Sequence, residues 1–472
     1  MLFPTLVFGL FFLVLFALTW AVGGRNEWRK LIILVGSWIF YGAWDWRFVL
    51  LLMVSAWLNF AAASLIDASA SPRLRRAILA IGVCANLTIL IMFKYYGFFV
   101  GQAAQALAAL HIPADLPLLQ VILPVGVSFF TFQGMSYLID VSRGRCARAS
   151  LLDVTLLMSF FAHLVAGPIV RGADLIPQFA ATPRMDRRMA SEGLLLIVWG
   201  LFKKTVIASQ LATNLVDPVF QDPSRHGALE LAAGAYGYAA QIYCDFSAYS
   251  DMAIGLAALL GYRFPRNFDQ PYRAASLQDF WRRWHISLSS WLRDYLYIPL
   301  GGGRGGLAMA CRNSMITMLI GGLWHGASWT FVIWGGLHGT VLCLERVWRA
   351  VKPKAWPSLP GWVGVVVTFH IVCLGWIFFR APTFADAIAY LGGLAGGLTA
   401  GLGAVPLVTP LNAALIVVGL AIHGLPPRLL ESWAARVRAL PAPAVGLGLA
   451  ACILLVDSLR PDGVAPFIYF QF

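Results

Sequence analysis

The stretch "NSMITMLIGGLWHGASWTFVIWGGLHGTVLCL", residues 313–344, contains no Asp, Glu, Lys or Arg. A helix needs only about 20 apolar residues to cross a bilayer, so this run is too long for one simple crossing. Its paired glycines, residues 321–322, permit a helix break or a close backbone approach. Basic loops at 261–274 and 345–354 flank the run, and both are predicted to be cytoplasmic. The sequence therefore predicts a segment that enters the membrane and returns, with His325 near its middle and facing a cavity rather than lipid.

Membrane character extends over the whole chain. Of its 472 residues, 59% are hydrophobic and 12% are charged, whereas about a quarter of the residues in a soluble protein are charged. Charge-free runs at 2–22, 48–66, 77–93 and 361–379 each approach the length of one crossing. Backbone groups must pair with one another in lipid, which favours helices at these lengths. We predict an all-α polytopic membrane protein with roughly 11 to 13 hydrophobic segments, some of them re-entrant or amphipathic.

The distribution of basic residues predicts an orientation. The first apolar segment has no basic residue before it and is followed by the basic stretch 25–30, a pattern typical of an uncleaved anchor with its N-terminus outside. An apolar run at 442–456 follows the basic loop 426–438 and leads the C-terminus outside as well. We therefore expect a multi-pass protein of the bacterial inner membrane with both termini in the periplasm. The formal net charge of +13 resides in short loops, where the positive-inside rule explains it without a nucleic-acid partner.

Domain organisation and motifs exclude several classes of protein. The sequence contains no internal repeat and no long linker, so we predict one integral membrane domain over 1–472. Seven cysteines are scattered singly without a CxxC pair, which favours neither a disulfide framework nor a zinc site. GxSxG and P-loop motifs are absent, which disfavours a hydrolase or an ATPase. A transporter remains an alternative of another class, although it predicts repeat symmetry between the two halves of the chain.

Residues 279–302, "DFWRRWHISLSSWLRDYLYIPLGG", have the pattern of one amphipathic helix. At about 100° per residue the large apolar side chains fall on one arc, with His285 near its edge, and only Ile286 is misplaced. The opposite, basic face holds Arg282, Arg283 and Arg293. Each Arg or Asp at the bilayer centre costs roughly 2.5–3.5 kcal/mol on insertion scales, so we predict that this helix lies along the interface or dips into the protein. Its basic face suits either the membrane surface or the phosphates of an anionic cofactor such as a nucleotide.

Histidines in apolar surroundings admit two interpretations. A histidine can be structural, bonded to a neighbouring carbonyl, and we keep this interpretation for His338 and His370. A neutral imidazole with a pKa near 6.5 can also take a proton from a hydroxyl and return it. His285 and His325 lie in a Trp-rich region without Asp, Glu or Cys at ligand spacing, which favours acyl transfer over metal binding. Two acids in "CDFSAYSD" are candidates for holding a histidine tautomer, with helix capping as the alternative: Asp245 and Asp251.

A series of blocks resembles the membrane-bound O-acyltransferase family, in the branch that acetylates bacterial exopolysaccharides. The blocks follow one another in order over most of 120–345, which we take as the family core. They are "PVGVSFFTFQGMSYLIDV" (124–141), "FFAHLVAGPIVR" (160–171), "YCDFSAYSDMAIGLAALLGYRFPRNFDQPY" (243–272), "FWRRWHISLSSWLRDYLYIPLGG" (280–302) and "GGLWHGASWTFVIWGGLHG" (321–339).

The resemblance implies a fold, an activity and partners. Helices would surround a central tunnel that joins a cytoplasmic acyl donor to an acceptor outside. His325 of the "LWHG" block would be catalytic, with His285 of the "RRWHISLS" block as its companion. The implied donor is acetyl-CoA, with no bound cofactor and no metal. The implied partners are membrane lipid, a periplasmic SGNH or esterase-like acetyltransferase and, through it, a polysaccharide such as alginate. Acetylation of cellulose or peptidoglycan, and D-alanyl transfer, remain open as alternatives on the same fold.

The C-terminal tail of the segment 442–472 carries a second resemblance. "FIYFQF" fits an F-x-Y-x-x-F pattern through Phe467, Tyr469 and Phe472, and is similar to the ending of a small membrane companion in the D-alanylation of teichoic acids. There the tyrosine is thought to carry the acyl group. A phenol has a pKa near 10, so its acetyl ester is a better leaving species than a sugar acetate. Tyr469 is thus a candidate acyl relay, with an aromatic interfacial anchor as the alternative.

Overall fold

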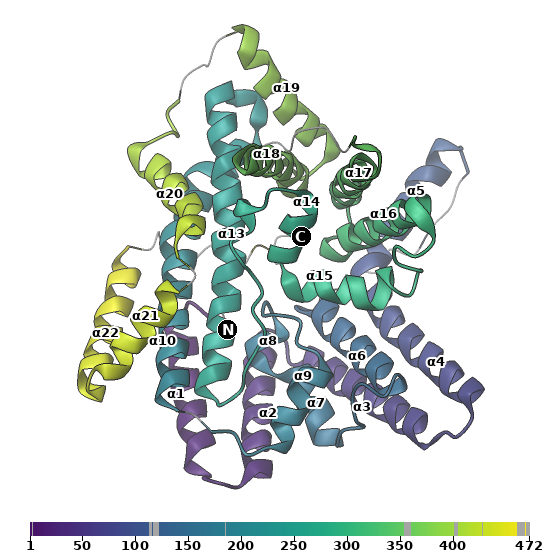
Figure 1. The fold of residues 1–472 in the computed structure, drawn as a ribbon, viewed down its shortest axis with the longest axis vertical. Coiled ribbons are helices and arrows are strands. Elements are labelled where there is room, and N and C mark those ends of the chain that lie inside the picture. The colour runs from purple at the N-terminus through teal and green to yellow at the C-terminus, as the bar shows by residue number, and fades with distance from the viewer. Residues whose placement is uncertain are drawn as a thin grey trace. The chain divides into compact units, whose positions relative to one another are not determined.

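The computed structural model describes residues 1, 3–112, 116, 122–184, 186–353, 360–400, 405–426, 428–459 and 468, except for the side chains of 398–400. Within these ranges the regular secondary structure is entirely helical, which confirms the predicted fold class (Figure 1). Contacts divide the chain into two compact units: Met1–Asp186 with Leu256–Pro265, and Arg187–Gly255 with Arg266–Phe472. A single integral membrane domain over 1–472 stays a prediction.

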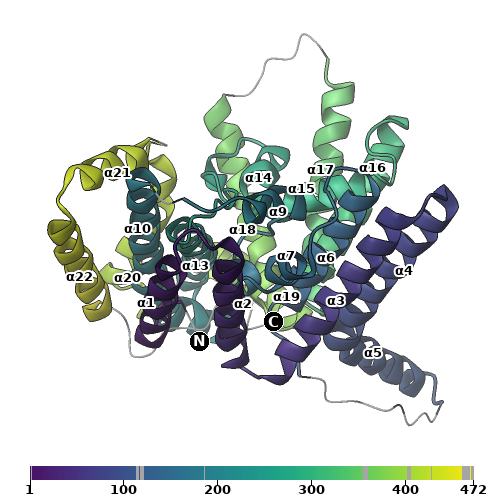
Figure 2. The ribbon, with the colours of Figure 1, turned by 90° about the horizontal axis from the view of Figure 1, so that it is seen from below.

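The first unit is built from α1 to α9, and the π-helical turn η1 joins α4 to α5. Figure 2 shows α1 and α2 side by side, followed by α3 and α4. Asn59 of α3 and Asn86 of α4 exchange two side-chain hydrogen bonds of 3.1 and 3.0 Å, which satisfy both buried amides between apolar helices. The bounds are α1 Leu6–Ala21, α2 Asn26–Gly42, α3 Arg47–Ala68, α4 Pro72–Leu90, η1 Ile91–Tyr95, α5 Tyr96–Ala109, α6 Val127–Ser142, α7 Leu151–Ser159, α8 Phe161–Leu164 and α9 Gly172–Ala180.

The second unit contains α10 to α22, and the last turn of α13 reaches into the first unit's range. The bounds of its α-helices are α10 Arg187–Phe202, α11 Ser209–Leu211, α12 Asp217–Gln221, α13 Ala228–Leu259, α14 Leu277–Arg283, α15 Ile286–Leu292, α16 Gly306–His325, α17 Trp329–Val351, α18 Gly361–Arg380, α19 Phe384–Ala400, α20 Pro410–Ala421, α21 Leu429–Ala439 and α22 Ala442–Ser458. Between them lie π-helical turns η2 Lys203–Ala208, η3 Ala212–Val216 and η6 Arg293–Tyr297, and 3-10 turns η4 Pro223–Arg225, η5 Pro271–Arg273 and η7 Ile422–Gly424.

Four helical stretches in the described ranges are long and apolar enough to cross a membrane: Arg47–Ala68, Pro72–Ala109, Arg187–Gln221 and Gly361–Arg380. A fifth joins them if the bent pair Pro410–Gly424 and Leu429–Ala439 forms one span. The predicted apolar runs at 48–66, 77–93 and 361–379 are therefore confirmed as helices of crossing length. Other apolar runs form shorter or interrupted helices, such as Leu6–Ala21 and Ala442–Ser458. The number of uninterrupted helices of crossing length is therefore smaller than the number of hydrophobic segments in the sequence.

The run 313–344 folds back on itself, as its length and glycines predict. α16 ends at His325, and α17 begins at Trp329 after Ser328, whose hydroxyl accepts from the backbone N–H of Thr330 at 3.3 Å. The two helices pack closely along their length. A Cβ on Gly322 would collide with the carbonyl oxygen of Phe331, so only glycine permits this approach. The hairpin holds His325 at its tip.

The amphipathic segment is not one helix, which corrects the prediction for 279–302. α14 ends at Arg283, and His285 has a φ of 41°, in the left-handed region that a non-glycine residue rarely adopts. The chain turns here because the backbone N–H of Ile286 donates to the carbonyl oxygen of Asn267 at 2.9 Å. Ile286, the one residue misplaced on the helical arc, stands directly after the break. The apolar arc is nevertheless mostly buried, with Trp284 and Leu288 among the least exposed.

Candidate active site

His325 is enclosed by aromatic side chains of the second unit. It is 3% exposed, and its ring centroid lies 5.0 Å from that of Trp324, 5.0 Å from that of Trp334 and 5.2 Å from that of Phe379. These three rings come from α16, α17 and α18. All three meet the imidazole at steep interplanar angles, 83°, 86° and 71°. The residue predicted to be catalytic therefore lies in an enclosed, largely apolar environment, while the implied tunnel stays a prediction.

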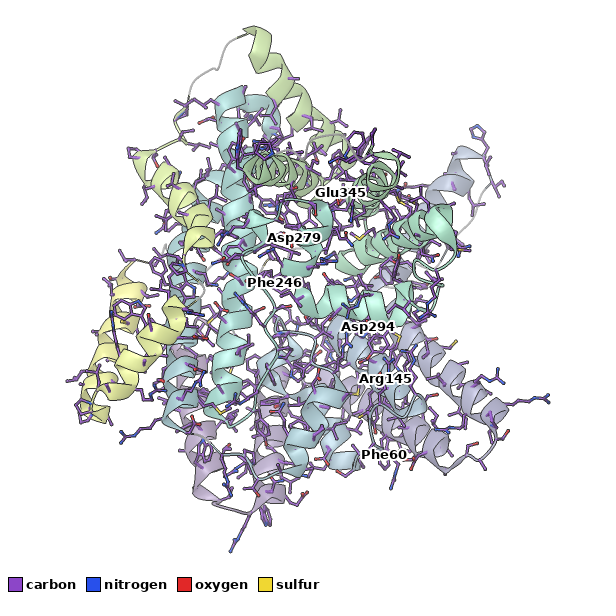
Figure 3. The ribbon with its side chains drawn as sticks, in the orientation of Figure 1. Phe60, Arg145, Phe246, Asp279, Asp294 and Glu345 are labelled. Atoms are coloured by element: carbon purple, nitrogen blue, oxygen red, sulfur yellow. The ribbon has the colours of Figure 1, made fainter. Side chains whose placement is uncertain are left out.

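His285 occupies the turn between α14 and α15 and is fully buried. Its Nδ1 lies 3.2 Å from the side-chain oxygen of Asn267, and its ring packs edge-on against Phe246 of α13 at 4.6 Å (Figure 3 labels Phe246). α14 and α15 have seven residues each, too few to cross a bilayer, so His285 stands outside the spanning helices. Burial lowers the pKa of His285 to about 3, because its surroundings disfavour the charged ring. The imidazole is therefore neutral at neutral pH, with a proton on one ring nitrogen and a lone pair on the other.

Trp324 brings the two predicted histidines together. Its ring centroid lies 5.8 Å from that of His285 and 5.0 Å from that of His325. Trp324 is itself 2% exposed, so this contact is sheltered from water. Two imidazoles beside one indole, in buried surroundings, can accept and return the proton of a reacting hydroxyl. In the described part of the chain no group of three or more His, Cys, Asp and Glu side chains is arranged to hold a metal ion.

His338 also belongs to this aromatic cluster, which the sequence analysis missed. It is fully buried on α17, and its ring lies 4.8 Å from that of Trp334, which contacts His325. Its Nδ1 accepts a hydrogen bond of 3.2 Å from the indole N–H of Trp281. The four-residue spacing of Trp334 and His338 places both on one helix face and was the available signal.

A pocket of about 170 Å³ lies among α14 to α17 and combines basic with aromatic side chains. Arg293 lines it but also pairs with Asp294, at 2.7 Å. The other two predicted arginines are not part of its lining: Arg282 is exposed, and Arg283 pairs with Asp279 at 3.0 Å. Figure 3 labels Asp279, Asp294 and a third acid of this region, Glu345. The pocket has further basic and aromatic residues that the sequence analysis did not single out: Trp281, Tyr297, Arg346 and Arg349.

The two acids of α13, which the sequence offered as candidates for holding a histidine tautomer or for capping a helix, have lysine partners. Asp245 lies 3.0 Å from Lys204, and Asp251 lies 2.7 Å from Lys203. Both lysines begin the π-helical turn η2, and each side chain is at most 2% exposed. A buried ammonium needs a counter-charge, and the acids supply it. The partner of His285 is instead the neutral side chain of Asn267.

The candidate relay Tyr469 lies outside the described residues. The residue before it, Ile468, is described and is 1% exposed. Its backbone N–H donates to the carboxylate of Asp245 at 3.1 Å. The tail is thus attached at Ile468 to the same buried ion pair that Lys204 forms.

Comparisons with known proteins find relatives that cover this region of the chain. Residues 139–382, which include both predicted histidines, match the profile of MBOAT, the membrane-bound O-acyltransferase family. The chain is 41% identical over 391 residues to the probable alginate O-acetylase AlgI of Pseudomonas aeruginosa, covering 82% of this chain and 73% of that protein. It is 36% identical over 394 residues to the peptidoglycan O-acetyltransferase of Helicobacter pylori, covering 78% and 74%. It is 26% identical over 286 residues to the teichoic acid D-alanyltransferase of Streptococcus thermophilus, covering 54% and 68%.

The extent of these matches settles the class. The chain belongs to the membrane-bound O-acyltransferase family. It is a multi-pass membrane O-acyltransferase, and the family inferred from the sequence blocks is confirmed.

Proposed function

We propose that the protein moves acetyl groups from cytoplasmic acetyl-CoA across the bacterial inner membrane toward an extracytoplasmic polysaccharide such as alginate. The observation that carries the proposal is the contact of one buried tryptophan, Trp324, with both predicted histidines. Acyl transfer to a hydroxyl needs a proton acceptor in a site from which water is excluded. The acceptor class rests on the relative named alginate O-acetylase. Peptidoglycan is the second candidate acceptor, because a relative of 36% identity is named for it.

His325 is proposed as the general base. Its imidazole takes the proton of the attacking hydroxyl, whose oxygen adds to the thioester carbonyl carbon of the donor. The carbon–sulfur bond then breaks, and the leaving thiolate of CoA takes the proton back from the imidazolium. An ester and a free thiol result, and the histidine returns to its starting state. His285 is proposed to orient the reacting group or to shuttle this proton.

The basic pocket is proposed as the entrance for the acyl donor. A guanidinium group binds phosphate oxygens through paired hydrogen bonds, so Arg293, Arg346 and Arg349 suit the phosphates of CoA. Trp281 lines the pocket and donates its indole hydrogen bond to His338, so the pocket adjoins the aromatic cluster around His325. Arg282 and Arg283 are proposed only for the inner membrane surface.

Tyr469 is proposed as an intermediate acyl carrier. Its phenolic oxygen would attack the thioester, release CoA as the thiol and hold the acetyl group as a phenyl ester. An acceptor hydroxyl delivered by a periplasmic SGNH or esterase-like partner would then attack this ester and restore the phenol. The attachment of Ile468 to Asp245 supports the proposal, because it ties the tail to the second unit one residue before the tyrosine. Tyr469→Phe keeps the aromatic ring, so polymer acetylation that survives this change would remove the relay step.

The proposed function is tested by the acetyl content of cell-surface polymers. His325→Ala should abolish the acetyl esters of the secreted polysaccharide while the protein remains in the membrane at the wild-type level. His370→Ala is the matched control, because His370 is exposed and contacts Tyr236 rather than Trp324. Full acetylation by His325→Ala at equal protein level would exclude the proposed role.

A further inference from the structure

Asn267 is locked in place beside His285 by hydrogen bonds on both ends of its amide. The side-chain oxygen accepts from the backbone N–H of Ser287 at 3.2 Å and from its hydroxyl at 2.8 Å. The side-chain nitrogen donates to the hydroxyl of Ser250 at 3.0 Å. Asn267 is 1% exposed, so water does not compete for these bonds.

The orientation of this amide decides the tautomer of His285. A backbone N–H can only donate, so the atom of Asn267 that faces Ser287 must be the oxygen. The same oxygen lies 3.2 Å from Nδ1 of His285. Two lone pairs at this distance would repel each other, so Nδ1 must carry the proton. The hydroxyl of Ser287 lies farther from Nδ1, at 3.4 Å, than from the amide oxygen, at 2.8 Å, and does not compete for this role.

With the proton on Nδ1, the lone pair of the His285 ring is on its second nitrogen, Nε2. Nε2 of His285 is buried and has no hydrogen-bond partner within the described ranges. The ring packs against Phe246 and Trp324, neither of which carries a charge. A buried nitrogen without a hydrogen-bond partner has lost its solvation, and a water, an ion or a reacting group can supply the missing bond.

We propose that Asn267 is a positioning residue that holds His285 in the Nδ1–H tautomer, so that Nε2 is the nitrogen with which His285 orients the reacting hydroxyl or shuttles the proton that His325 takes from it. This inference rests on the proposed acyl transfer and adds a residue to its site. When Nε2 takes the proton, Nδ1 keeps its hydrogen bond to the amide oxygen, which stabilises the imidazolium. Because the amide carries no charge, it does not trap the proton on His285, and Nε2 can pass the proton on.

The tautomer can be measured directly in the full-length protein. Solid-state NMR of the ¹⁵N-histidine-labelled chain in lipid bilayers separates protonated from unprotonated ring nitrogens, and His285→Gln identifies the signals. At neutral pH we expect a protonated Nδ1 and an unprotonated Nε2 in the wild type and in Asn267→Asp. Asn267→Leu should shift the proton toward Nε2. Asn412→Leu is the matched control, because within the described ranges its buried amide bonds to the carbonyls of Asn214 and Leu407 and not to His285, and it should leave the His285 signals unchanged.

Turnover gives the second readout. Asn267→Leu should lower kcat for acetyl transfer about 100-fold or more with little change in the KM for acetyl-CoA, since the donor still binds. Asn267→Asp should keep most of the activity. A protonated Nε2 in the wild type, or an unchanged tautomer and kcat in Asn267→Leu, would overturn the proposal. If the wild type itself transfers no acetyl group, the proposed function fails, whereas the NMR result still decides the tautomer.

Discussion

Neutralising Asp245 should lower the free energy of unfolding far more than neutralising an exposed acid. Asp245→Asn keeps the shape of the side chain and an acceptor for the N–H of Ile468, but removes the charge opposite Lys204. The charged atoms are 3.0 Å apart, and the side chains are 3% and 1% exposed, so little water can replace the lost attraction. Removing one charge of such a buried pair costs about 3–5 kcal/mol of unfolding free energy. Glu192 also pairs with an arginine, Arg188, but the two side chains are 34% and 65% exposed. Glu192→Gln should therefore lower the free energy of unfolding by at most about 1 kcal/mol.

The assay is denaturant unfolding of the purified proteins in one detergent, followed by tryptophan fluorescence. The double variant Lys204→Met with Asp245→Leu should recover most of the loss, because both charges leave the interior together. Suppose that Asp245→Asn lowers the free energy of unfolding by less than about 1 kcal/mol, or by no more than Glu192→Gln does. Burial then does not set the strength of the Asp245–Lys204 pair, and the reasoning is refuted.

Three further changes probe the hairpin and the histidines. Trp324→Ala removes the ring that contacts both histidines and should lower the acetyl content of the polymer about tenfold or more, whereas Trp324→Phe should retain most of it. Gly322→Val places a side chain against the carbonyl oxygen of Phe331 and should leave little folded protein on gel filtration; Gly336→Ala, whose added Cβ would meet a single atom at 3.7 Å, should give the wild-type yield. The pKa of His285 is lowered to about 3, below its ordinary 6.5, so the unfolded chain binds a proton that the folded chain excludes, and stability is lost as pH falls through this window. His285→Gln should therefore show a shallower decline in unfolding free energy below about pH 6.5; an identical decline in both proteins would contradict the assignment.

The return of the chain at His325 could be predicted because its causes are local. The charge-free run 313–344 is longer than one crossing, it contains paired glycines, and basic loops flank it. The break at His285 could not be predicted with the same ease. Its cause is Asn267, which stands 18 residues earlier in the chain and bonds to the residues after the histidine. A misplaced Ile286 was the only local sign that the helical pattern is interrupted.

Partners that lie far apart in sequence account for the remaining differences. Asp251 meets Lys203 across 48 residues, and no spacing rule connects them. His338 meets Trp281 across 57 residues, so its place in the aromatic cluster depends on how α14 and α17 pack. The sequence therefore identifies candidate residues by their type, whereas their contacts depend on how the helices pack.

The close packing of α16 and α17 limits how the enzyme can move during turnover. Gly322 lies against the backbone of Phe331, and Gly335 lies against the backbone of Met318. With main chain against main chain, the helices have no side-chain layer that could yield, so neither can slide along the other. We therefore expect the imidazole at the tip to keep its position relative to both helices, so that any movement during turnover lies in other parts of the chain.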